Sequence, residues 1–358
     1  MSRFHPLTVR AVDRETRDAV VLSFEVPEAL RDAFRYEPGQ HLTLRTRIDG
    51  EDVRRSYSIF PSAQEQALKV AIKRDAGGGL FSNWANDRLK AGASVEVMPP
   101  MGHFGAPMQA DARRHYVAFV AGSGITPILS IIATTLQAEP RSSFTLFYGN
   151  RASGTVMFRE ALAALKDRYL TRFNLVHVLS REAQDIELLH GRIDAKRASA
   201  LLDHWAPLAD VDTVFLCGPD GMMQAVGGML KERGFPESRI RMERFASSIP
   251  QRRPRPAVES KGSASETEVT VIMDGTRRTF RLDRTRDTIL EGGLRNGIEL
   301  PYSCKGGVCS TCRCRLVEGE VDMDVNFALE DYEVARGEIL ACQSYPVTGR
   351  VTVDFDPA

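Results

Sequence analysis

Residues 300–314 read Leu-Pro-Tyr-Ser-Cys-Lys-Gly-Gly-Val-Cys-Ser-Thr-Cys-Arg-Cys, and this stretch places several cysteines in one short loop. Cys304, Cys309 and Cys312 follow a C-x4-C-x2-C spacing, and Cys342 comes after a further 29 residues. This is the ligand spacing of plant-type [2Fe–2S] clusters. The two glycines of the loop let backbone N–H groups approach the sulfurs. The sequence therefore predicts a [2Fe–2S] cluster held by these four thiolates.

Two alternatives remain open at this motif. Four cysteines can also bind zinc, but zinc sites usually pair two C-x2-C or C-x4-C knuckles, and Cys342 has no such neighbour. Cys314 lies two residues after Cys312 in an alternating stretch. We interpret Cys314 as a buried structural thiol, and it is the competing ligand if the assignment shifts by one cysteine.

The composition is that of a multidomain globular protein. The 358 residues are 43% hydrophobic and 26% charged, which predicts two or three domains with buried cores. Lys plus Arg and Asp plus Glu both number 47, so no net field favours nucleic acid or a membrane surface as partner. The N-terminus lacks the apolar core of a signal peptide, and the clustered cysteines favour metal ligation in a reducing compartment. We therefore expect a cytoplasmic protein.

The hydrophobic pattern predicts a different architecture for each part of the chain. Residues 1–109 show short alternating runs broken by Pro and Gly, which predict an antiparallel β-barrel. Residues 110–246 alternate apolar strands (116–121, 144–149, 174–180 and 213–218) with helical segments, as in a doubly wound parallel sheet. Residues 247–266 hold three Pro, five Ser and three Arg and predict a flexible linker, with docking of the arginines as the alternative.

The C-terminal part, residues 267–358, contains the cysteine motif. Its first segment predicts a β-hairpin, because Asp274-Gly275 separates two alternating runs. A helix is expected over Thr288–Arg295. The cysteine-containing stretch resembles ferredoxin domains of the plant and cyanobacterial type, and this resemblance implies an α+β domain of the β-grasp fold.

A second motif lies in the predicted barrel. Arg55-Ser56-Tyr57-Ser58 resembles the R-x-Y-S signature of the ferredoxin–NADP reductase superfamily, and Pro38-Gly39-Gln40 lies upstream, where that superfamily has P-G-Q. An arginine can pair with the flavin phosphate, an aromatic ring can stack on the isoalloxazine, and a small hydroxyl can reach its N5 side. The resemblance implies an FAD-binding barrel, with Ser58 at the reacting face.

A glycine-rich turn follows the predicted strand LKVAIKR (68–74), which contains Ile72 and Lys73. Gly77–Ser82 reads Gly-Gly-Gly-Leu-Phe-Ser and precedes a helix expected over Asn83–Leu89. A turn that leads into a helix N-terminus is a suitable site for the flavin pyrophosphate, which favours FAD over FMN. An ordinary surface loop is the alternative. The resemblance assigns flavin contacts to Ile72, Lys73, Gly78, Gly79, Leu80, Phe81 and Ser82.

Nicotinamide nucleotide motifs occur in the predicted parallel sheet. The loop Gly122–Pro127 (Gly122, Ser123, Gly124, Ile125, Thr126 and Pro127) separates the first strand from a helix expected to begin near Pro127, as in a pyrophosphate-binding loop. Cys217-Gly218-Pro219 matches the C-G-P motif of the superfamily, which implies that Cys217 lies beside the nicotinamide ring. Taken alone, Cys217 would be interpreted as a buried strand residue. Phe245 is the candidate aromatic cover of the flavin, and the end of a core strand is the alternative.

The preference between NADPH and NADH depends on the ends of two strands. Ser180-Arg181 occupies the position at which NADP-using relatives hold the 2′-phosphate, and Asn150-Arg151 can add to this site. NAD-using enzymes place an acid near the ribose instead, and Glu182 follows directly. We predict NADPH rather than NADH.

The complete chain resembles oxygenase reductases with a C-terminal cluster. Within this class it resembles the reductase subunits of phenylacetyl-CoA 1,2-epoxidase complexes, on segments that include PGQHLTL (38–44), AGSGITP (121–127), FTLFYGNR (144–151), LLHGRID (188–194) and LPYSCKGGVCSTCRC (300–314). The resemblance implies an oxidoreductase that passes electrons from NADPH through FAD and the cluster to a di-iron oxygenase of phenylacetate catabolism. Alternative partners are a steroid or other ring-hydroxylating oxygenase, or a hybrid-cluster protein. A non-enzymatic cluster carrier is the alternative from another class.

Overall fold

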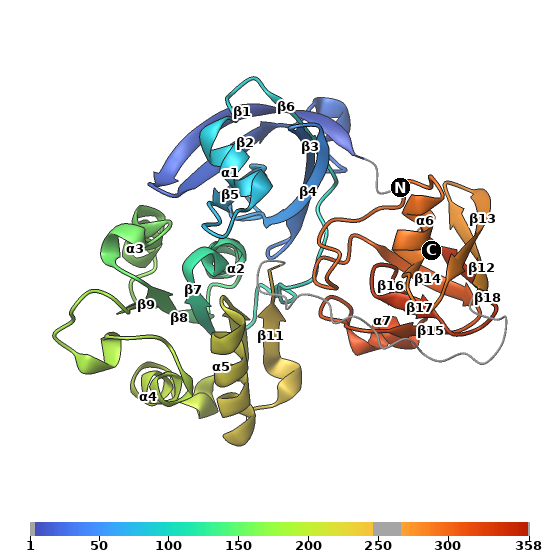
Figure 1. The fold of residues 1–358 in the computed structure, drawn as a ribbon. Coiled ribbons are helices and arrows are strands. Elements are labelled where there is room, and N and C mark those ends of the chain that lie inside the picture. Colours follow the sequence, from blue (N-terminus) through green and yellow to red (C-terminus); the bar gives the residue numbers. More distant parts are fainter. Residues whose placement is uncertain (1–3, 246–265, 357–358) are drawn as a thin grey trace. The chain divides into compact units, whose positions relative to one another are not determined.

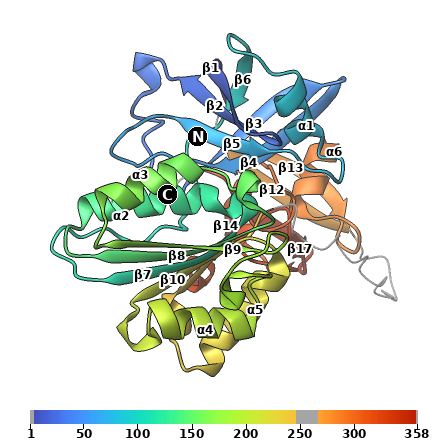
Figure 2. The ribbon, with the colours of Figure 1, turned by 90° about the vertical axis from the view of Figure 1, so that its left-hand side faces the viewer.

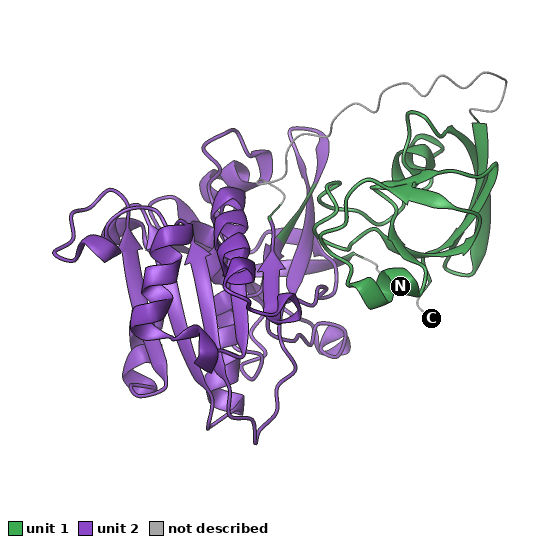
Figure 3. Ribbon diagram, turned by 90° about the horizontal axis from the view of Figure 1, so that it is seen from below, with its two compact units in different colours: residues 1–4, 54–56, 245–358 green, residues 5–53, 57–244 purple. Residues whose placement is uncertain are grey.

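The computed structural model describes residues 4–245 and 266–356, and Figure 1 shows the order of their elements. Two compact units result, which Figure 3 distinguishes by colour. Residues 5–53 and 57–244 form one unit, and residues 1–4, 54–56 and 245–358 form the other. The predicted linker, residues 247–266, lies outside the described residues except for Glu266, which begins a strand.

A six-stranded antiparallel sheet forms the N-terminal part, in the order β4-β3-β6-β1-β2-β5. A bridge between Ile59, just after β4, and Val70 of β5 joins the two edges, so the sheet closes as a barrel. Its interior is filled by alternate strand residues such as Leu7, Leu22 and Leu42, each fully buried. The elements are β1 (His5–Thr16), β2 (Ala19–Glu25), β3 (His41–Ile48), β4 (Glu51–Ser58), β5 (Lys69–Lys73), α1 (Leu80–Asp87) and β6 (Ser94–Val97).

The second part is a five-stranded parallel sheet in the order β11-β10-β7-β8-β9. Figure 2 shows α2 and α3 on one face of this sheet and α4 and α5 on the other, as expected for a doubly wound fold. The elements are β7 (His115–Ala121), α2 (Ile125–Ala138), β8 (Ser143–Asn150), α3 (Arg159–Arg168), β9 (Phe173–Leu179), α4 (Ala195–Trp205), β10 (Thr213–Cys217), α5 (Asp220–Glu232) and β11 (Ile240–Glu243).

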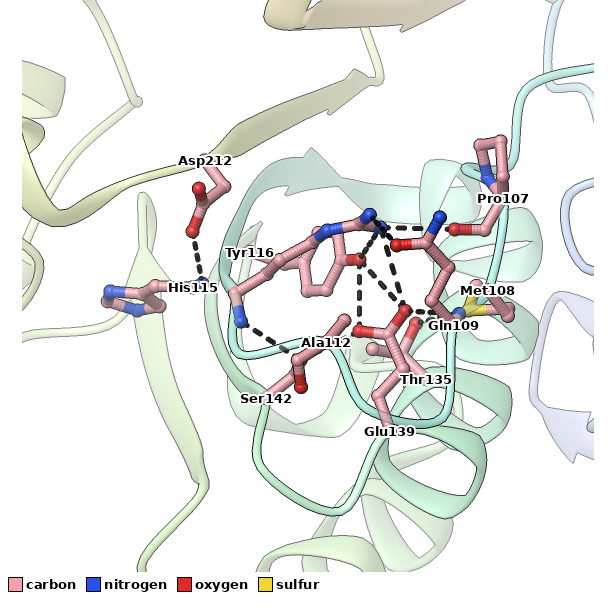
Figure 4. Close-up of polar contacts among 11 residues, drawn as sticks. Pro107, Met108, Gln109, Ala112, His115, Tyr116, Thr135, Glu139, Ser142 and Asp212 are labelled. Carbon is pink, nitrogen blue, oxygen red and sulfur yellow. Dashed lines mark hydrogen bonds and ion pairs between the residues drawn. The ribbon is translucent and has the colours of Figure 1, made fainter.

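A buried polar cluster anchors the segment that connects the barrel to the parallel sheet (Figure 4). The carboxylate of Glu139, directly after α2, is fully buried. It accepts hydrogen bonds from the Tyr116 hydroxyl at 3.1 Å, the Ser142 hydroxyl at 2.7 Å and the Gln109 backbone N–H at 3.0 Å, and Arg114 lies 3.7 Å away. A buried carboxylate is tolerated only with such partners, so the cluster fixes the connecting segment against the end of α2.

The C-terminal part has a mixed five-stranded sheet, β13-β12-β18-β14-β16, and a small pair formed by β15 and β17. The predicted hairpin turn at Asp274-Gly275 is present, with φ of +53° and +69°, the conformation that a two-residue type I′ turn requires. Thr288 caps α6 through a hydrogen bond with Glu291. The elements are β12 (Glu266–Met273), β13 (Thr276–Asp283), α6 (Ile289–Arg295), β14 (Arg313–Glu318), β15 (Val321–Met323), α7 (Asp331–Ala335), β16 (Glu338–Leu340), β17 (Ser344–Pro346) and β18 (Arg350–Asp354).

Candidate functional site

The predicted nucleotide-binding residues meet at one edge of the parallel sheet. Gly122 follows β7, Arg151 follows β8, Ser180 follows β9 and Gly218 follows β10. Since all five strands are parallel, their carboxyl ends lie together at this edge, where open α/β sheets bind their ligands.

The loop after β7 has the geometry of an anion site. A 3-10 turn over Gly122–Gly124 leads directly into α2, and the N–H of Ile125, the first residue of the helix, donates to the carbonyls of Gly122 and Ser123. The start of α2 has no side-chain cap, so the positive end of the helix dipole faces this loop. The Tyr148 hydroxyl donates to the Gly122 carbonyl at 3.0 Å, and Thr126 Oγ1 donates to the Ser123 carbonyl at 3.0 Å. The helix begins at Ile125, two residues before the expected start near Pro127, so Thr126 lies within the first turn.

Gly124 lies against the end of β10. A Cβ atom at this position would be 2.3 Å from the Cys217 carbonyl oxygen, which no side chain could accommodate without movement. The pyrophosphate-type loop and the Cys217-Gly218-Pro219 segment therefore approach each other at backbone distance, and only glycine permits this contact.

Cys217 is fully buried at the carboxyl end of β10, and the register of the parallel pair places Glu243 of β11 directly beside it. The Ser58 hydroxyl, at the end of β4 in the barrel, donates to Glu243 Oε2 at 3.3 Å. The structure thus brings together Ser58 and Cys217, the two residues that the resemblance assigned to the reacting faces of flavin and nicotinamide.

Glu243 is the residue of this group that sequence reasoning missed. Burial raises the pKa of its carboxyl to about 8, and burial with the adjacent Glu243 raises the pKa of the Cys217 thiol. At neutral pH the Glu243 carboxyl and the Cys217 thiol are therefore both protonated and uncharged. The available signal was an acid at the end of the last strand of the parallel sheet, two residues before Phe245, which is half-buried just after β11.

The flavin motif lies on β4 and around the start of α1. The rings of Tyr57 and Phe81 have centroids 5.6 Å apart, and Trp84 packs edge-on against Phe81 at 5.4 Å. On the same strand, Arg55 is exposed and donates to the Arg54 carbonyl, and Ser56 is half-buried. An exposed arginine and a half-buried aromatic ring on one strand match the donor set for a flavin and its phosphate.

The glycine-rich turn is ordered by hydrogen bonds of its own. Asp75 Oδ1 accepts from the Gly77 N–H at 2.9 Å, and Ser82 Oγ accepts from the Asp75 N–H at 3.1 Å. Gly79 is the N-cap of α1 and provides no side-chain cap, so first-turn N–H groups remain for an anion. The helix spans Leu80–Asp87 and not Asn83–Leu89; Leu80, Phe81 and Ser82 are therefore helical.

The residues that precede this turn are less accessible than the motif suggested. Ile72 is fully buried in the barrel core, and its carbonyl accepts from Asn86 Nδ2 at 3.1 Å. Lys73 lies 3.7 Å from Asp18. Flavin contacts by Ile72 and Lys73 remain predictions, and that of Ile72 would have to be made by its backbone.

The expected adenosine end of the nucleotide site lies on the loops after β8 and β9. Asn150 is buried, whereas Arg151 and Arg181 are exposed and Ser180 is half-buried. The Arg181 N–H donates to the Arg151 carbonyl at 2.7 Å, so the two loops run side by side beyond the strands. Arg151 and Arg181 therefore lie on adjacent loops at this edge, and their binding of the 2′-phosphate remains a prediction.

The cysteine loop presents backbone N–H groups to sulfur. The Gly306 N–H donates to Cys304 Sγ at 3.3 Å, and the Cys304 N–H donates to Cys309 Sγ at 3.5 Å. The hydrogen bond from Cys309, followed by those from backbone groups, lowers the pKa of Cys304 to about 6. Such donors favour the thiolate form that iron requires.

The four predicted ligands fall into two pairs. The thiol of Cys304 is within hydrogen-bonding reach of Cys309, and that of Cys312 is within reach of Cys342. Among residues 4–245 and 266–356, no group of three or more His, Cys, Asp or Glu could hold a single metal ion. Two pairs suit a cluster whose two irons each take two thiolates, and they disfavour the zinc alternative, in which all four must converge on one ion.

Cys314 lies in β14, paired with Ile339 of β16, and is 3% exposed within the domain core. Burial raises the pKa of its thiol. Cys309 and Cys312 are equally buried, so burial alone does not separate Cys314 from the ligands, and its structural role remains a prediction.

Comparison with known protein families matches three parts of the chain. Residues 6–105 match the oxidoreductase FAD-binding domain, residues 119–227 the oxidoreductase NAD-binding domain, and residues 271–347 the 2Fe-2S iron-sulfur cluster binding domain. The chain belongs to the ferredoxin reductase family of oxygenase reductase components, and it is an oxidoreductase that binds FAD, a nicotinamide nucleotide and a [2Fe–2S] cluster. The alternative of a non-enzymatic cluster carrier is therefore not retained.

Individual relatives define the class more closely. The chain is 47% identical to a component of the 1,2-phenylacetyl-CoA epoxidase of Escherichia coli (strain K12), over 99% of both chains. It is 36% identical to the ferredoxin reductase component of 3-ketosteroid-9-alpha-monooxygenase of Rhodococcus rhodochrous, over 99% of this chain and 97% of that protein. In fold it resembles phthalate dioxygenase reductase, with a TM-score of 0.56 at 24% identity over 98% of both chains.

The fold comparison confirms the predicted sequence of an FAD-binding β domain, a parallel-sheet nucleotide domain and a C-terminal ferredoxin domain. No helix within residues 4–245 and 266–356 combines the length and apolar character needed to cross a membrane.

Proposed function

We propose that the protein transfers electrons from NADPH through FAD and the [2Fe–2S] cluster to a di-iron oxygenase, and that this oxygenase is the phenylacetyl-CoA 1,2-epoxidase of phenylacetate catabolism. Electron transfer to an oxygenase follows from the family. We propose in addition that the coenzyme is NADPH, that the partner oxygenase is of the di-iron type, and that the individual residues have the roles given below. Because the cluster requires reduced thiols, we also propose a cytoplasmic location.

The observation that carries the enzyme chemistry is the contact between Ser58 and Glu243 beside Cys217. It joins the end of a barrel strand to the carboxyl edge of the nucleotide sheet within one compact unit. Ser58 would hold the flavin and Cys217 the nicotinamide within one site, and hydride transfer requires that the two groups be held close together.

The residues of the site bind and orient the flavin and the nicotinamide nucleotide, and they keep negative charge out of the site. Arg55 and the first turn of α1 would supply charge and N–H donors for the flavin phosphates, and the loop Gly122–Pro127 at the start of α2 would hold the nucleotide pyrophosphate. Neutral Glu243 and Cys217 keep negative charge away from the place where hydride arrives. When bound, FAD exchanges electrons in pairs or singly and the cluster carries one at a time, so the protein converts a pair into single electrons.

The named partner is supported by the relative from Escherichia coli, which is 47% identical over 99% of both chains. A second candidate is the oxygenase of 3-ketosteroid 9α-hydroxylation, supported by 36% identity over a similar length. The test mixes the purified protein and NADPH with each oxygenase component and measures the oxygenated product. We expect coupled product with phenylacetyl-CoA epoxidase and at least tenfold less with the ketosteroid enzyme. The reverse order would refute the named partner and leave the family assignment intact.

The coenzyme assignment has a separate test. The purified protein should show flavin absorbance together with that of the cluster, and the flavin should be reduced by NADPH with a KM at least tenfold below that for NADH. Equal KM values would contradict the assignment of NADPH.

A further inference from the structure

Glu182 is the residue that made the choice of coenzyme ambiguous, and the structure shows where its carboxylate is held. Oε2 accepts a hydrogen bond from the Ser153 backbone N–H at 2.7 Å and another from the Ser153 hydroxyl at 2.9 Å. These two donors lower the pKa of Glu182, so it is a carboxylate at neutral pH. The acid that follows β9 is therefore bound to the loop that follows β8.

Backbone hydrogen bonds join the same two loops. The Ser180 N–H donates to the Asn150 carbonyl at 2.9 Å, and the Arg181 N–H donates to the Arg151 carbonyl at 2.7 Å. Glu182 adds the next link in this series, and this link is made by its side chain. Together the three links hold the loop after β8 parallel to the loop after β9.

The loop after β8 is anchored on its far side by the buried residues 156–158, and the Phe158 N–H donates to Glu15 Oε1. The turn that precedes them faces the loop after β9. Ser153–Thr155 form a single 3-10 turn, stabilised locally because Thr155 Oγ1 accepts from the Ala152 N–H at 3.2 Å. Gly154 at its centre would meet nothing within 4 Å with an added Cβ, so the tip of the turn has open space around it. The position of the turn relative to Arg181 is therefore set jointly by the backbone bond from the Arg181 N–H to the Arg151 carbonyl and by the bonds of Ser153 with Glu182.

Two arginines repel each other when no anion lies between them, and each is exposed here. A dianionic group such as the 2′-phosphate of NADPH would be attracted to two arginines on adjacent loops. An acid free to reach the ribose would favour NADH instead. Its carboxylate would accept a hydrogen bond from the 2′-hydroxyl and would repel a 2′-phosphate.

We propose that Glu182 is a positioning residue for the 2′-phosphate: its carboxylate, held by Ser153, keeps Arg151 beside Arg181 and is itself withdrawn from the ribose. This inference rests on the proposed use of NADPH and deepens it. The acid that sequence reasoning counted against NADPH thereby contributes to its binding.

The test compares two variants of equal charge, Glu182→Ala and Glu182→Gln, in the full-length protein with its cofactors. An amide oxygen can still accept from Ser153, whereas alanine cannot. We measure calorimetric Kd values for adenosine 2′,5′-bisphosphate and for adenosine 5′-monophosphate, which differ by the 2′-phosphate alone. Glu187→Ala, which removes an exposed acid from the same loop, is the control for net charge.

We expect Glu182→Ala to weaken binding of the bisphosphate about tenfold, Glu182→Gln to weaken it less than threefold, and neither to change binding of the monophosphate. The KM for NADPH should rise in parallel with kcat unchanged. Tighter bisphosphate binding in Glu182→Ala and Glu182→Gln would overturn the inference, because the carboxylate would then be repelling the phosphate. An equal loss for both nucleotides would overturn it too, because the role would then be structural.

The Kd values of the wild-type protein distinguish a failure of this inference from a failure of the proposed use of NADPH. If wild type binds the bisphosphate no more tightly than the monophosphate, the assignment of NADPH fails and the inference fails with it. If wild type prefers the bisphosphate but the variants do not respond, the inference alone is overturned.

Discussion

At the residue scale, Cys314 and Cys342, the two candidates for the fourth ligand, have different predicted roles. Cys342 is paired with Cys312, while Cys314 lies in the core of β14. We expect Cys342→Ala to abolish the visible absorbance of the cluster and its bound iron and sulfide. Cys314→Ala should retain both and lose only about 1 kcal/mol of stability, as for a small buried side chain. Loss of the cluster in Cys314→Ala with retention in Cys342→Ala would reverse the assignment.

Glu243 should determine how flavin reduction depends on pH. Its carboxyl is neutral below pH about 8 and becomes a carboxylate above that value, which places a negative charge beside Ser58 and Cys217. Flavin reduction adds negative charge to the site, so repulsion of about 1–2 kcal/mol should slow it roughly tenfold at high pH.

Stopped-flow absorbance from about pH 7 to about pH 9.5 tests this expectation. Glu243→Gln stays neutral at every pH, so its rate should remain flat over the range in which the wild-type rate falls. Glu232→Gln, a change at an exposed acid on α5, should retain the wild-type profile. Superimposable profiles for wild type and Glu243→Gln would contradict the role given to Glu243.

At the scale of elements, the approach of the loop after β7 to the end of β10 can be tested with one methyl group. Gly124→Ala places a Cβ 2.3 Å from the Cys217 carbonyl oxygen, whereas Gly154→Ala, in the 3-10 turn after β8, meets nothing within 4 Å. The overlap should cost about 1–3 kcal/mol and move the loop. We expect Gly124→Ala to raise the KM for NADPH at least tenfold with flavin content unchanged, and Gly154→Ala to stay within twofold. Equal KM values in the two variants would contradict a tight contact.

The elements themselves were largely predictable from local pattern. The hairpin at Asp274-Gly275, the capped helix α6 and the four apolar strands of the parallel sheet appear where the sequence placed them. Helix starts were less accurate. We expected α1 to begin at Asn83 and α2 near Pro127, but they begin at Leu80 and Ile125. Glycine-rich turns look irregular in sequence, yet their last residues can already take up helical geometry.

At the scale of the whole molecule, the expected linker between the nucleotide and ferredoxin domains suggests that the ferredoxin domain must move. We predict that a covalent cross-link between the two compact units leaves flavin reduction by NADPH unchanged. Oxygenase-coupled product formation should fall at least tenfold, because the cluster could then no longer reach the oxygenase. A reagent of the same chemistry with one reactive end is the control. Unchanged product formation in the cross-linked protein would contradict this motion.

The cluster motif, the class of each domain and most of the nucleotide loop could be predicted from the sequence, because they depend on spacing and periodicity within short segments. The contacts between residues far apart in the chain became visible with the folded structure alone. Ser58 and Glu243 are 185 residues apart, and their contact depends on the packing of a barrel strand against the edge of a parallel sheet. The hydrogen-bond partner of Glu182 could likewise not be predicted from the sequence. Its carboxylate accepts from the hydroxyl and N–H of Ser153, which folding brings next to it.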